Sequence, residues 1–283
     1  MPTREGTKEA CMTRVTPLRA GLAAMSAFAA LILAGTCGAA PAAEQTAQID
    51  GHLVAYRVLG QGRPVLVVIG GLGEGMSAFN NVSNELAAAA TVIVYDRAGY
   101  GDSGAPVGPQ DAGAVERELE GLLQASGATG PYVLLGHSTG GLYAEYFAAK
   151  HPDLIAGLVL EESRPADFTA RCQMAGLAMC VATPAMVRFM GQGAQADVAA
   201  FDAVMDQVAA TPPLTSKPVL VLSRPAAAGA KPIDMLWAQA QADLAARYPG
   251  SHHLTAPAGG HDMHHDERDW FLATVRDFLA SVP

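Results

Sequence analysis

Residues 132–141, YVLLGHSTGG, constrain the fold of this chain more than any other segment. Tyr132 to Leu135 form a short apolar run typical of a buried strand, and an apolar pattern at helical spacing begins directly after the glycines (Leu142, Tyr143, Tyr146, Phe147). The chain must therefore turn from a strand into a helix within GHSTG. This order is that of a nucleophile elbow, which strains the backbone of its serine and lifts the hydroxyl above the strand end. Ser138 is the candidate nucleophile.

The surroundings of Ser138 support this interpretation. We expect any side chain at Gly136 or Gly140 to crowd the turn. The helix that follows directs its first N–H groups towards negative charge that develops on a bound substrate.

The N-terminus has the features of a signal peptide. Arg14 and Arg19 precede an uncharged stretch from 20 to 43, and Ala40-Pro41-Ala42 fits an A-x-A cleavage site. We predict a secretory signal peptide over residues 1–42, outside the fold, with translation starting at Met12 as an open alternative. An uncleaved membrane anchor is the rival interpretation, but the richness in Ala and Gly argues against it. The predicted location is secreted or periplasmic, without stable membrane insertion after cleavage.

The mature part, residues 43–283, is acidic. Removal of residues 1–42 takes away Arg4, Lys8, Arg14, Arg19, Glu5 and Glu9, which leaves 14 basic and 25 acidic side chains and a net charge of −11. Such a surface repels phosphate backbones, so nucleic acid is excluded as a partner. Cys172 and Cys180 are the two cysteines that remain, and in an oxidising compartment we expect them to form a disulfide, two buried thiols being the alternative.

Strand and helix patterns alternate along the mature part. Apolar runs predict strands at 64–69, 91–95, 132–135, 154–162, 218–223 and 251–255, with an edge strand at 52–58. Helical patterns occupy 81–90, 112–125, 234–248 and the C-terminus. The alternation predicts a mostly parallel sheet with helices on both faces, which is an α/β fold in one domain.

Residues 164–216 interrupt this alternation. About fifty residues between two strands are too many for a connection and suit a small helical lid. The segment holds two helical patterns and five methionines (Met174, Met179, Met186, Met190, Met205). These methionines could fill a core or could form a flexible apolar wall over a pocket, and the sequence leaves both roles open.

Four motifs in order resemble the α/β-hydrolase family across the whole mature part. They are GGLG at 70–73, YDRAGYGDSG at 95–104, GHSTG at 136–140 and GGHDMHHDE at 259–267. The resemblance implies an eight-stranded, mostly parallel sheet flanked by helices, with a small helical lid after the sixth strand. Within the second motif we interpret Asp96, Arg97 and Ser103 as structural.

The resemblance and the chemistry together assign roles. Ser138 attacks a carbonyl carbon, and His261 takes the serine proton and returns it to the leaving group. The oxyanion would be bound by the N–H of Thr139 and, from the family alignment, by the N–H of Leu72. Gly70-Gly71 stands where many relatives have His-Gly, which leaves a backbone donor unaffected.

No cofactor and no metal is predicted. A zinc cluster of His261, His264, His265 and Asp262 was considered and set aside, because the elbow leaves a metal little to do. His137, next to the nucleophile, is interpreted as a packed side chain.

The acid of the triad is the least defined residue. The family's usual loop after 218–223 contains no carboxylate before Asp234, which opens a predicted helix and could serve as its cap. Some relatives carry the acid at the end of the sixth strand, where GLVLEE places Glu162. Glu161 should point to the other side of the sheet. We favour Glu162, with Asp234 as the alternative.

The sequence thus predicts an exported serine hydrolase that cleaves an ester or related acyl bond of a small molecule through an acyl-enzyme. Acyl transfer, carbon–carbon bond hydrolysis, peptidase, lactonase and cofactor-free haloperoxidase activities remain alternatives on this fold. A non-catalytic binding protein on the same scaffold is a further alternative. Substrate identity and oligomeric state stay open.

Overall fold

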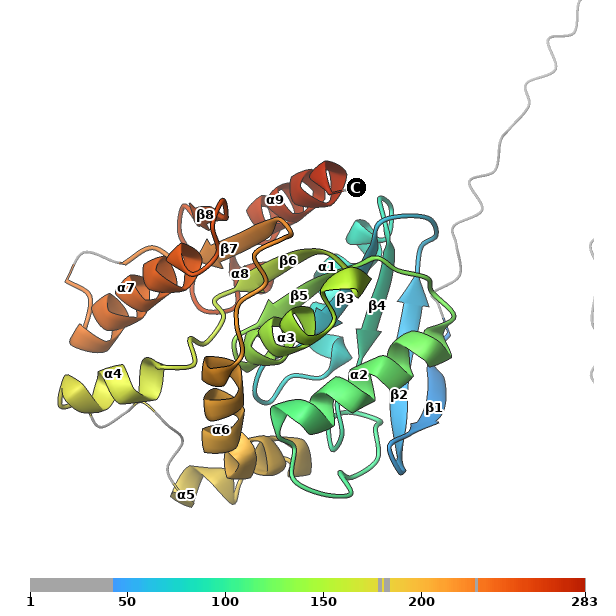
Figure 1. Cartoon of the computed structure of the whole chain (residues 1–283), viewed down its shortest axis with the longest axis horizontal. Helices are drawn as coiled ribbons and strands as arrows, with labels where there is room; N and C mark the ends of the chain where they lie inside the picture. The colour runs from blue at the N-terminus through green and yellow to red at the C-terminus, as the bar shows by residue number, and fades with distance from the viewer. Residues whose placement is uncertain (1–42, 178–179, 181–183, 227–228, 283) are drawn as a thin grey trace, which may run out of the picture. The chain divides into compact units, whose positions relative to one another are not determined.

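The computed structural model describes residues 43–177, 180, 184–226 and 229–282 (Figure 1). Within these residues eight strands form one sheet in the order β1-β2-β4-β3-β5-β6-β7-β8. The strands are β1 (Gln45–Ile49), β2 (His52–Leu59), β3 (Val65–Ile69), β4 (Thr91–Tyr95), β5 (Tyr132–His137), β6 (Ile155–Glu161), β7 (Val219–Ser223) and β8 (His252–Thr255). Strand β2 runs antiparallel to its neighbours β1 and β4. The remaining neighbours in this order, from β4 to β8, all pair in parallel. The predicted α/β fold with a mostly parallel eight-stranded sheet is confirmed.

The interpretation of 52–58 as an edge strand was wrong. Strand β1 pairs with β2 and occupies the edge, so β2 lies inside the sheet between β1 and β4. Asp50 and Gly51 form the connecting turn with φ of 47° and 86°. Two residues with positive φ are the mark of a type I′ hairpin, for which Asp-Gly is a preferred sequence. That dipeptide was the available signal, but the largely exposed segment 45–49 lacks the apolar alternation that reveals a strand.

Alternate side chains of the central strands enter two separate cores. On one face, Leu134 of β5 packs with residues of α2 (Ala112–Ser126) and α3 (Thr139–Lys150). On the other, Val133 and Leu135 pack with residues of α1 (Asn80–Leu86) and α9 (Arg268–Ser281). This division follows from the two-residue period of a strand. It explains why these strands read as continuous apolar runs, since both faces are covered (Figure 1).

Among the described residues between β6 and β7, three helices lie inside the segment predicted as a lid. They are α4 (Phe168–Met174), α5 (Pro184–Val187) and α6 (Gln192–Ala210). Helix α6 packs on α3 through Val204 and Val208. It is also held by a buried ion pair in which Arg97 Nη2 lies 2.6 Å from Asp197 Oδ2. Arg97 and Asp197 are both 2% exposed, so this pair fixes the position of α6 against the loop after β4, and the role of Arg97 is structural.

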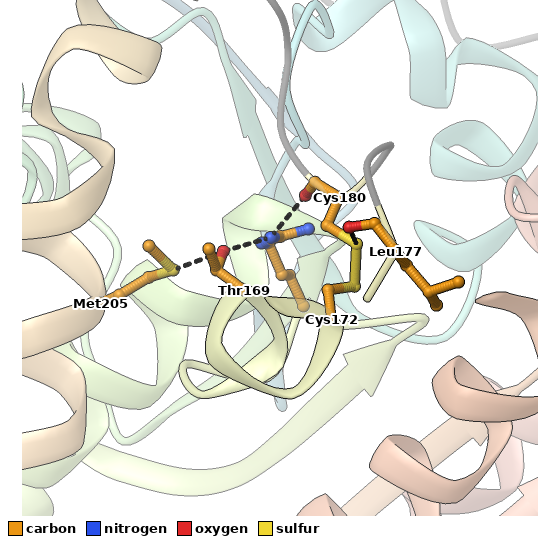
Figure 2. Close-up of a disulfide and its surroundings, with 6 residues drawn as sticks. Thr169, Cys172, Leu177, Cys180 and Met205 are labelled. Atoms are coloured by element: carbon orange, nitrogen blue, oxygen red, sulfur yellow. Dashed lines mark hydrogen bonds between the residues drawn. A yellow bond between two sulfur atoms is a disulfide. The ribbon is translucent and has the colours of Figure 1, made fainter. Parts of the chain in front are cut away.

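Cys172 and Cys180 are joined by a disulfide that connects the end of α4 to the segment after it (Figure 2). Both half-cystines are buried. Figure 2 shows Thr169 and Leu177 beside the bond, and Thr169 Oγ1 donates to Met205 Sδ of α6 at 3.4 Å. The disulfide itself packs in a small cluster with Phe168, Trp237 and Ala240.

The remaining elements are the 3₁₀ turns η1 (Met76–Phe79) and η2 (Pro152–Leu154), helix α7 (Pro232–Ala246) and helix α8 (Met263–Asp266). Within the ranges that the structure describes, no helix has both the length and the apolar character to cross a membrane.

Candidate active site

Ser138 lies at the tip of the elbow between β5 and α3. Its backbone adopts φ 53° and ψ −119°, a region that residues other than glycine rarely occupy. A Cβ at Gly140 would come 2.2 Å from the carbonyl oxygen of Ile69, and one at Gly136 would come 2.6 Å from Gly141 Cα. The two glycines are thus required by close backbone contacts, and the reversal holds Ser138 in one conformation.

His261 and Glu162 lie in contact. Nδ1 of His261 is 3.2 Å from Oε2 of Glu162, which immediately follows β6 and is fully buried. The carboxylate also accepts hydrogen bonds at 2.8 Å from the backbone N–H of Arg224 and from the indole N–H of Trp237. Because these contacts fix the carboxylate as an acceptor, Nδ1 of His261 carries the proton and Nε2 is left to accept one.

Asp234 lies on α7 and contacts Arg224, not His261. Its Oδ1 accepts a hydrogen bond from Arg224 Nη2 at 3.0 Å, and among the described residues it makes no hydrogen bond to His261. The expectation that it caps the helix was wrong, because α7 starts at Pro232 and its N-cap is Lys231. The geometry favours Glu162 over Asp234 as the partner of His261.

Glu161 points away from His261 and towards His264, as alternation along a strand requires. Its Oε1 lies 2.7 Å from the backbone N of His264 and 2.9 Å from the Nδ1 of the same residue. Adjacent glutamates thus serve different elements: Glu162 holds the ring of His261, and Glu161 holds the helix that follows it.

Leu72 and Thr139, the predicted oxyanion donors, line a cavity together with Ser138. Thr139 is the first residue of α3, so its N–H has no acceptor within the helix. Hydrogen bonds hold the loop that carries Leu72. The N–H of Gly71 donates to Glu74 Oε2 at 2.6 Å, and Arg97 donates to the carbonyls of Gly70 and Gly71.

His137 is buried as expected, but its ring also makes polar contacts that the sequence analysis missed. Nδ1 lies 2.7 Å from Glu74 Oε2, and Nε2 lies 3.0 Å from the carbonyl oxygen of His261. A carbonyl only accepts, so Nε2 donates, and Nδ1 then donates to the carboxylate. His137 therefore connects the glycine loop to the loop that carries His261. Glu74, directly after GGLG, was the available signal.

The charges of this pair follow from the same contacts. Burial by itself would lower the pKa of His137, but the hydrogen bond to Glu74 and the charges of Glu161 and Glu74 raise that pKa to about 9. Burial also opposes the charge on Glu74, yet its contacts with His137 and Gly71 bring its pKa down to about 2. At neutral pH the pair is a buried imidazolium and carboxylate.

Two cavities meet at Ser138. The larger, about 480 Å³, has an apolar wall from the insertion with Met186, Met190, Val198 and Phe201. The smaller, about 260 Å³, is bounded by His261, Trp237 and Phe168. Two of the five methionines thus form a pocket wall, Met205 is buried in the core and Met174 is exposed, whereas Met179 lies outside the described residues. Both roles considered for the methionines occur.

A family model described as the alpha/beta hydrolase fold matches residues 64–213, which is more than half of the chain. The chain belongs to the α/β-hydrolase fold family. It is similar to RutD of Azorhizobium caulinodans, with 32% identity over 119 residues that cover 41% of this chain and 44% of RutD. It is also similar to the (lyso)-N-acylphosphatidylethanolamine lipase of Bos taurus, with 31% identity over 113 residues that cover 37% of this chain and 33% of the lipase. The match thus spans less than half the length of these curated relatives.

Among solved structures, the enol-lactonase from Burkholderia xenovorans LB400 superposes with a TM-score of 0.65 and 22% sequence identity. The superposition covers 84% of this α/β-hydrolase and all of the lactonase chain. At this identity the likeness concerns the fold.

The four residues considered as a zinc cluster do not come together in this α/β-hydrolase. His264 is buried against Glu161, whereas His265 is exposed beside Asp266. Within the described ranges, the close groups of possible ligands are instead His137, Glu161 and His264, and His137, His261 and Asp262. Both contain His137, whose two ring nitrogens already make hydrogen bonds. A metal there would displace the contacts that hold the site.

Proposed function

We propose that this α/β-hydrolase is a serine hydrolase that cleaves an ester or related acyl bond of a small molecule through an acyl-enzyme. The observation that carries the proposal is the combination of Ser138 on a strained elbow with His261, which lines the same cavity and contacts the buried Glu162. Such a combination supplies a nucleophile, a base and a group that orients the base.

The proposed reaction uses the site as follows. Ser138 Oγ attacks the carbonyl carbon while Nε2 of His261 accepts its proton, and Glu162 stabilises the imidazolium that forms. The N–H groups of Leu72 and Thr139 bind the oxyanion. His261 then protonates the leaving group, and water hydrolyses the acyl-enzyme by the reverse steps. No hydrogen bond joins Ser138 Oγ to His261 among the described residues, and such contacts often shorten only when substrate is bound.

The relatives support an acyl-bond hydrolase. One carries the name of a lipase and one structural neighbour that of an enol-lactonase, and both names denote cleavage of an acyl–oxygen bond. For this chain we propose the broader class, since the matches cover part of the relatives or concern the fold.

Replacement of Ser138 tests the proposal. Ser138→Ala removes the attacking oxygen from a turn without opening a cavity, so turnover of 4-nitrophenyl esters should fall by up to about 10⁶-fold with the fold intact. A fluorophosphonate probe should label the wild type and leave the variant unlabelled. Activity of the variant at even a tenth of the wild-type value would show that Ser138 is not the nucleophile, and an unlabelled wild type would favour a binding protein.

We further propose export, on the basis of the predicted signal peptide over residues 1–42. N-terminal sequencing of protein recovered from the periplasm or medium of an expressing bacterium should give a start near Ala43. Full-length protein confined to the cytoplasm would contradict export without affecting the proposed chemistry.

A further inference from the structure

Arg164 lies beside the nucleophile and borders both cavities. Its backbone N–H donates to the carbonyl oxygen of Ser138 at 2.9 Å, which ties the two residues together. Its guanidinium contacts two aromatic rings, with Cζ 5.2 Å from the ring centre of Phe168 and 4.9 Å from that of Phe201. The planar cation is thus held in one place at the junction of the two cavities.

The guanidinium of Arg164 has only neutral partners. Nη2 donates to Thr169 Oγ1 at 2.8 Å and to the carbonyl of Cys180 at 2.9 Å, and buried Nε has no acceptor. It makes no salt bridge in the part of the chain that the structure describes. Elsewhere only Glu5 and Glu9 are acidic, and both fall within the predicted signal peptide.

The other arginines near the site differ in this respect. Arg97 is paired with Asp197, and Arg224 lies 3.0 Å from Asp234 and 3.6 Å from Glu162. A partly buried charge without a counterion has lost hydration that no ion pair offsets. Burial lowers the pKa of Arg164 to about 10, so the group remains a cation at neutral pH. If the only role of Arg164 were to donate a hydrogen bond to the Cys180 carbonyl, a neutral donor would be sufficient and no charge would be needed.

We propose that Arg164 is the binding site for a carboxylate group carried by the substrate. The proposal rests on the proposed function and narrows it to esters or lactones whose molecule also bears a carboxylate. Because Nη2 already donates to Thr169 and Cys180 and Nε is buried, Nη1 is the nitrogen left to donate to a substrate carboxylate, through a charge-assisted hydrogen bond. The apolar wall of the larger cavity suits an aliphatic link between the carboxylate and the ester. Exposed Asp202, at the same cavity, disfavours a more highly charged group such as a phosphate dianion.

A matched pair of substrates tests this. The mono-4-nitrophenyl ester of adipic acid carries a terminal carboxylate, and its ω-amide has nearly the same shape without the charge. We expect the wild-type kcat/KM to favour the carboxylate by about 10- to 100-fold, the usual contribution of a hydrogen bond to a charged group. In Arg164→Gln this preference should fall to about one. Both esters are measured on one preparation, so any misfolded fraction cancels from the ratio.

The control variant is Arg188→Gln, which removes an exposed arginine of the same insertion that lines neither cavity. Its preference should stay within about twofold of the wild type, because exposed charges at a distance are screened by salt. A second measurement does not need turnover: adipate should protect Ser138 from a fluorophosphonate probe, and Arg164→Gln should abolish that protection.

The outcomes separate the two proposals. Equal turnover of the two esters by the wild type, or a preference retained in Arg164→Gln, would overturn the carboxylate site and leave the serine hydrolase intact. Absence of both turnover and probe labelling would overturn the serine hydrolase, and the carboxylate site with it. If the probe labels Ser138 but neither ester reacts, protection by adipate decides.

Discussion

At the scale of single residues, the two candidates for the proposed triad acid differ in their surroundings. Glu162 accepts three hydrogen bonds in a fully buried position, one of them from His261, whereas Asp234 is partly exposed and pairs with Arg224. A buried carboxylate that accepts hydrogen bonds from fixed donors can keep a neighbouring histidine in one tautomer. A half-exposed ion pair contributes little to either catalysis or stability.

Glu162→Gln should lower turnover by about 10³-fold or more with binding little changed, because the charge that stabilises the His261 imidazolium is lost while the shape is kept. Asp234→Asn, the matched control, should keep most of its activity and lose at most about 1 kcal/mol of stability. Kinetics on 4-nitrophenyl esters, at folded fractions matched by circular dichroism, distinguish the two. An inactive Asp234→Asn beside an active Glu162→Gln would move the acid to Asp234.

At the scale of elements, the insertion between β6 and β7 supplies a wall of the larger cavity, and a buried ion pair and a disulfide help to hold it. The buried Arg97–Asp197 pair holds α6, and the disulfide holds the segment after α4. Cys180 also lines both cavities, and its carbonyl oxygen accepts a hydrogen bond from Arg164. The disulfide therefore helps to position Arg164 through the backbone of Cys180.

Loss of the disulfide should cost about 2 kcal/mol of unfolding free energy, because it closes a short loop. Urea unfolding of the wild type with and without a thiol reductant measures this. The variant Cys172→Ser/Cys180→Ser serves as the control and should not respond to the reductant. Intact-mass analysis of unreduced exported protein after alkylation should find no modified cysteine, and two alkylated thiols would show that the bond does not form.

The elements also show what a sequence can and cannot reveal. The central strands were predictable because burial on both faces leaves continuous apolar runs. Glu162 was chosen as the acid because of the family resemblance at the end of the sixth strand, and its contact with His261 supports that choice. Strand β1 was missed because its exposed side chains carry no pattern. His137 contacts Glu74, which is 63 positions away, and Arg164 contacts Cys180, which is 16 positions away. No local sequence pattern connects residues at these separations.

At the scale of the whole molecule, the site is held together by charges as well as by the two cores. The His137–Glu74 pair joins the glycine loop after β3, the end of β5 and the loop before α8 in one buried network. A change in the charge of this pair therefore weakens contacts among three segments that are distant in sequence. We expect it to change the free energy of unfolding of the whole domain.

The pH dependence of stability tests this network. The pKa of His137 is raised from an ordinary value of 6.5 to about 9, so the folded state binds a proton that the unfolded chain loses first. The contribution is complete below pH 6.5 and is lost as pH rises through 9. By linkage it amounts to about 3 kcal/mol for a group this deeply buried.

Urea unfolding at pH 6, 8 and 10 should therefore show a stability advantage of the wild type over His137→Gln that shrinks steadily with pH. The comparison with a variant removes the contributions of other groups, such as buried Glu145, whose pKa burial raises to about 7. His265→Gln, which replaces an exposed histidine beside Asp266, should differ from the wild type by the same small amount at all three values. A constant difference for His137→Gln between pH 6 and 10 would mean that His137 is neutral in the folded protein. In that case Nε2 could not donate to the His261 carbonyl while Nδ1 donates to Glu74, and the proposed connection between the two loops would fail.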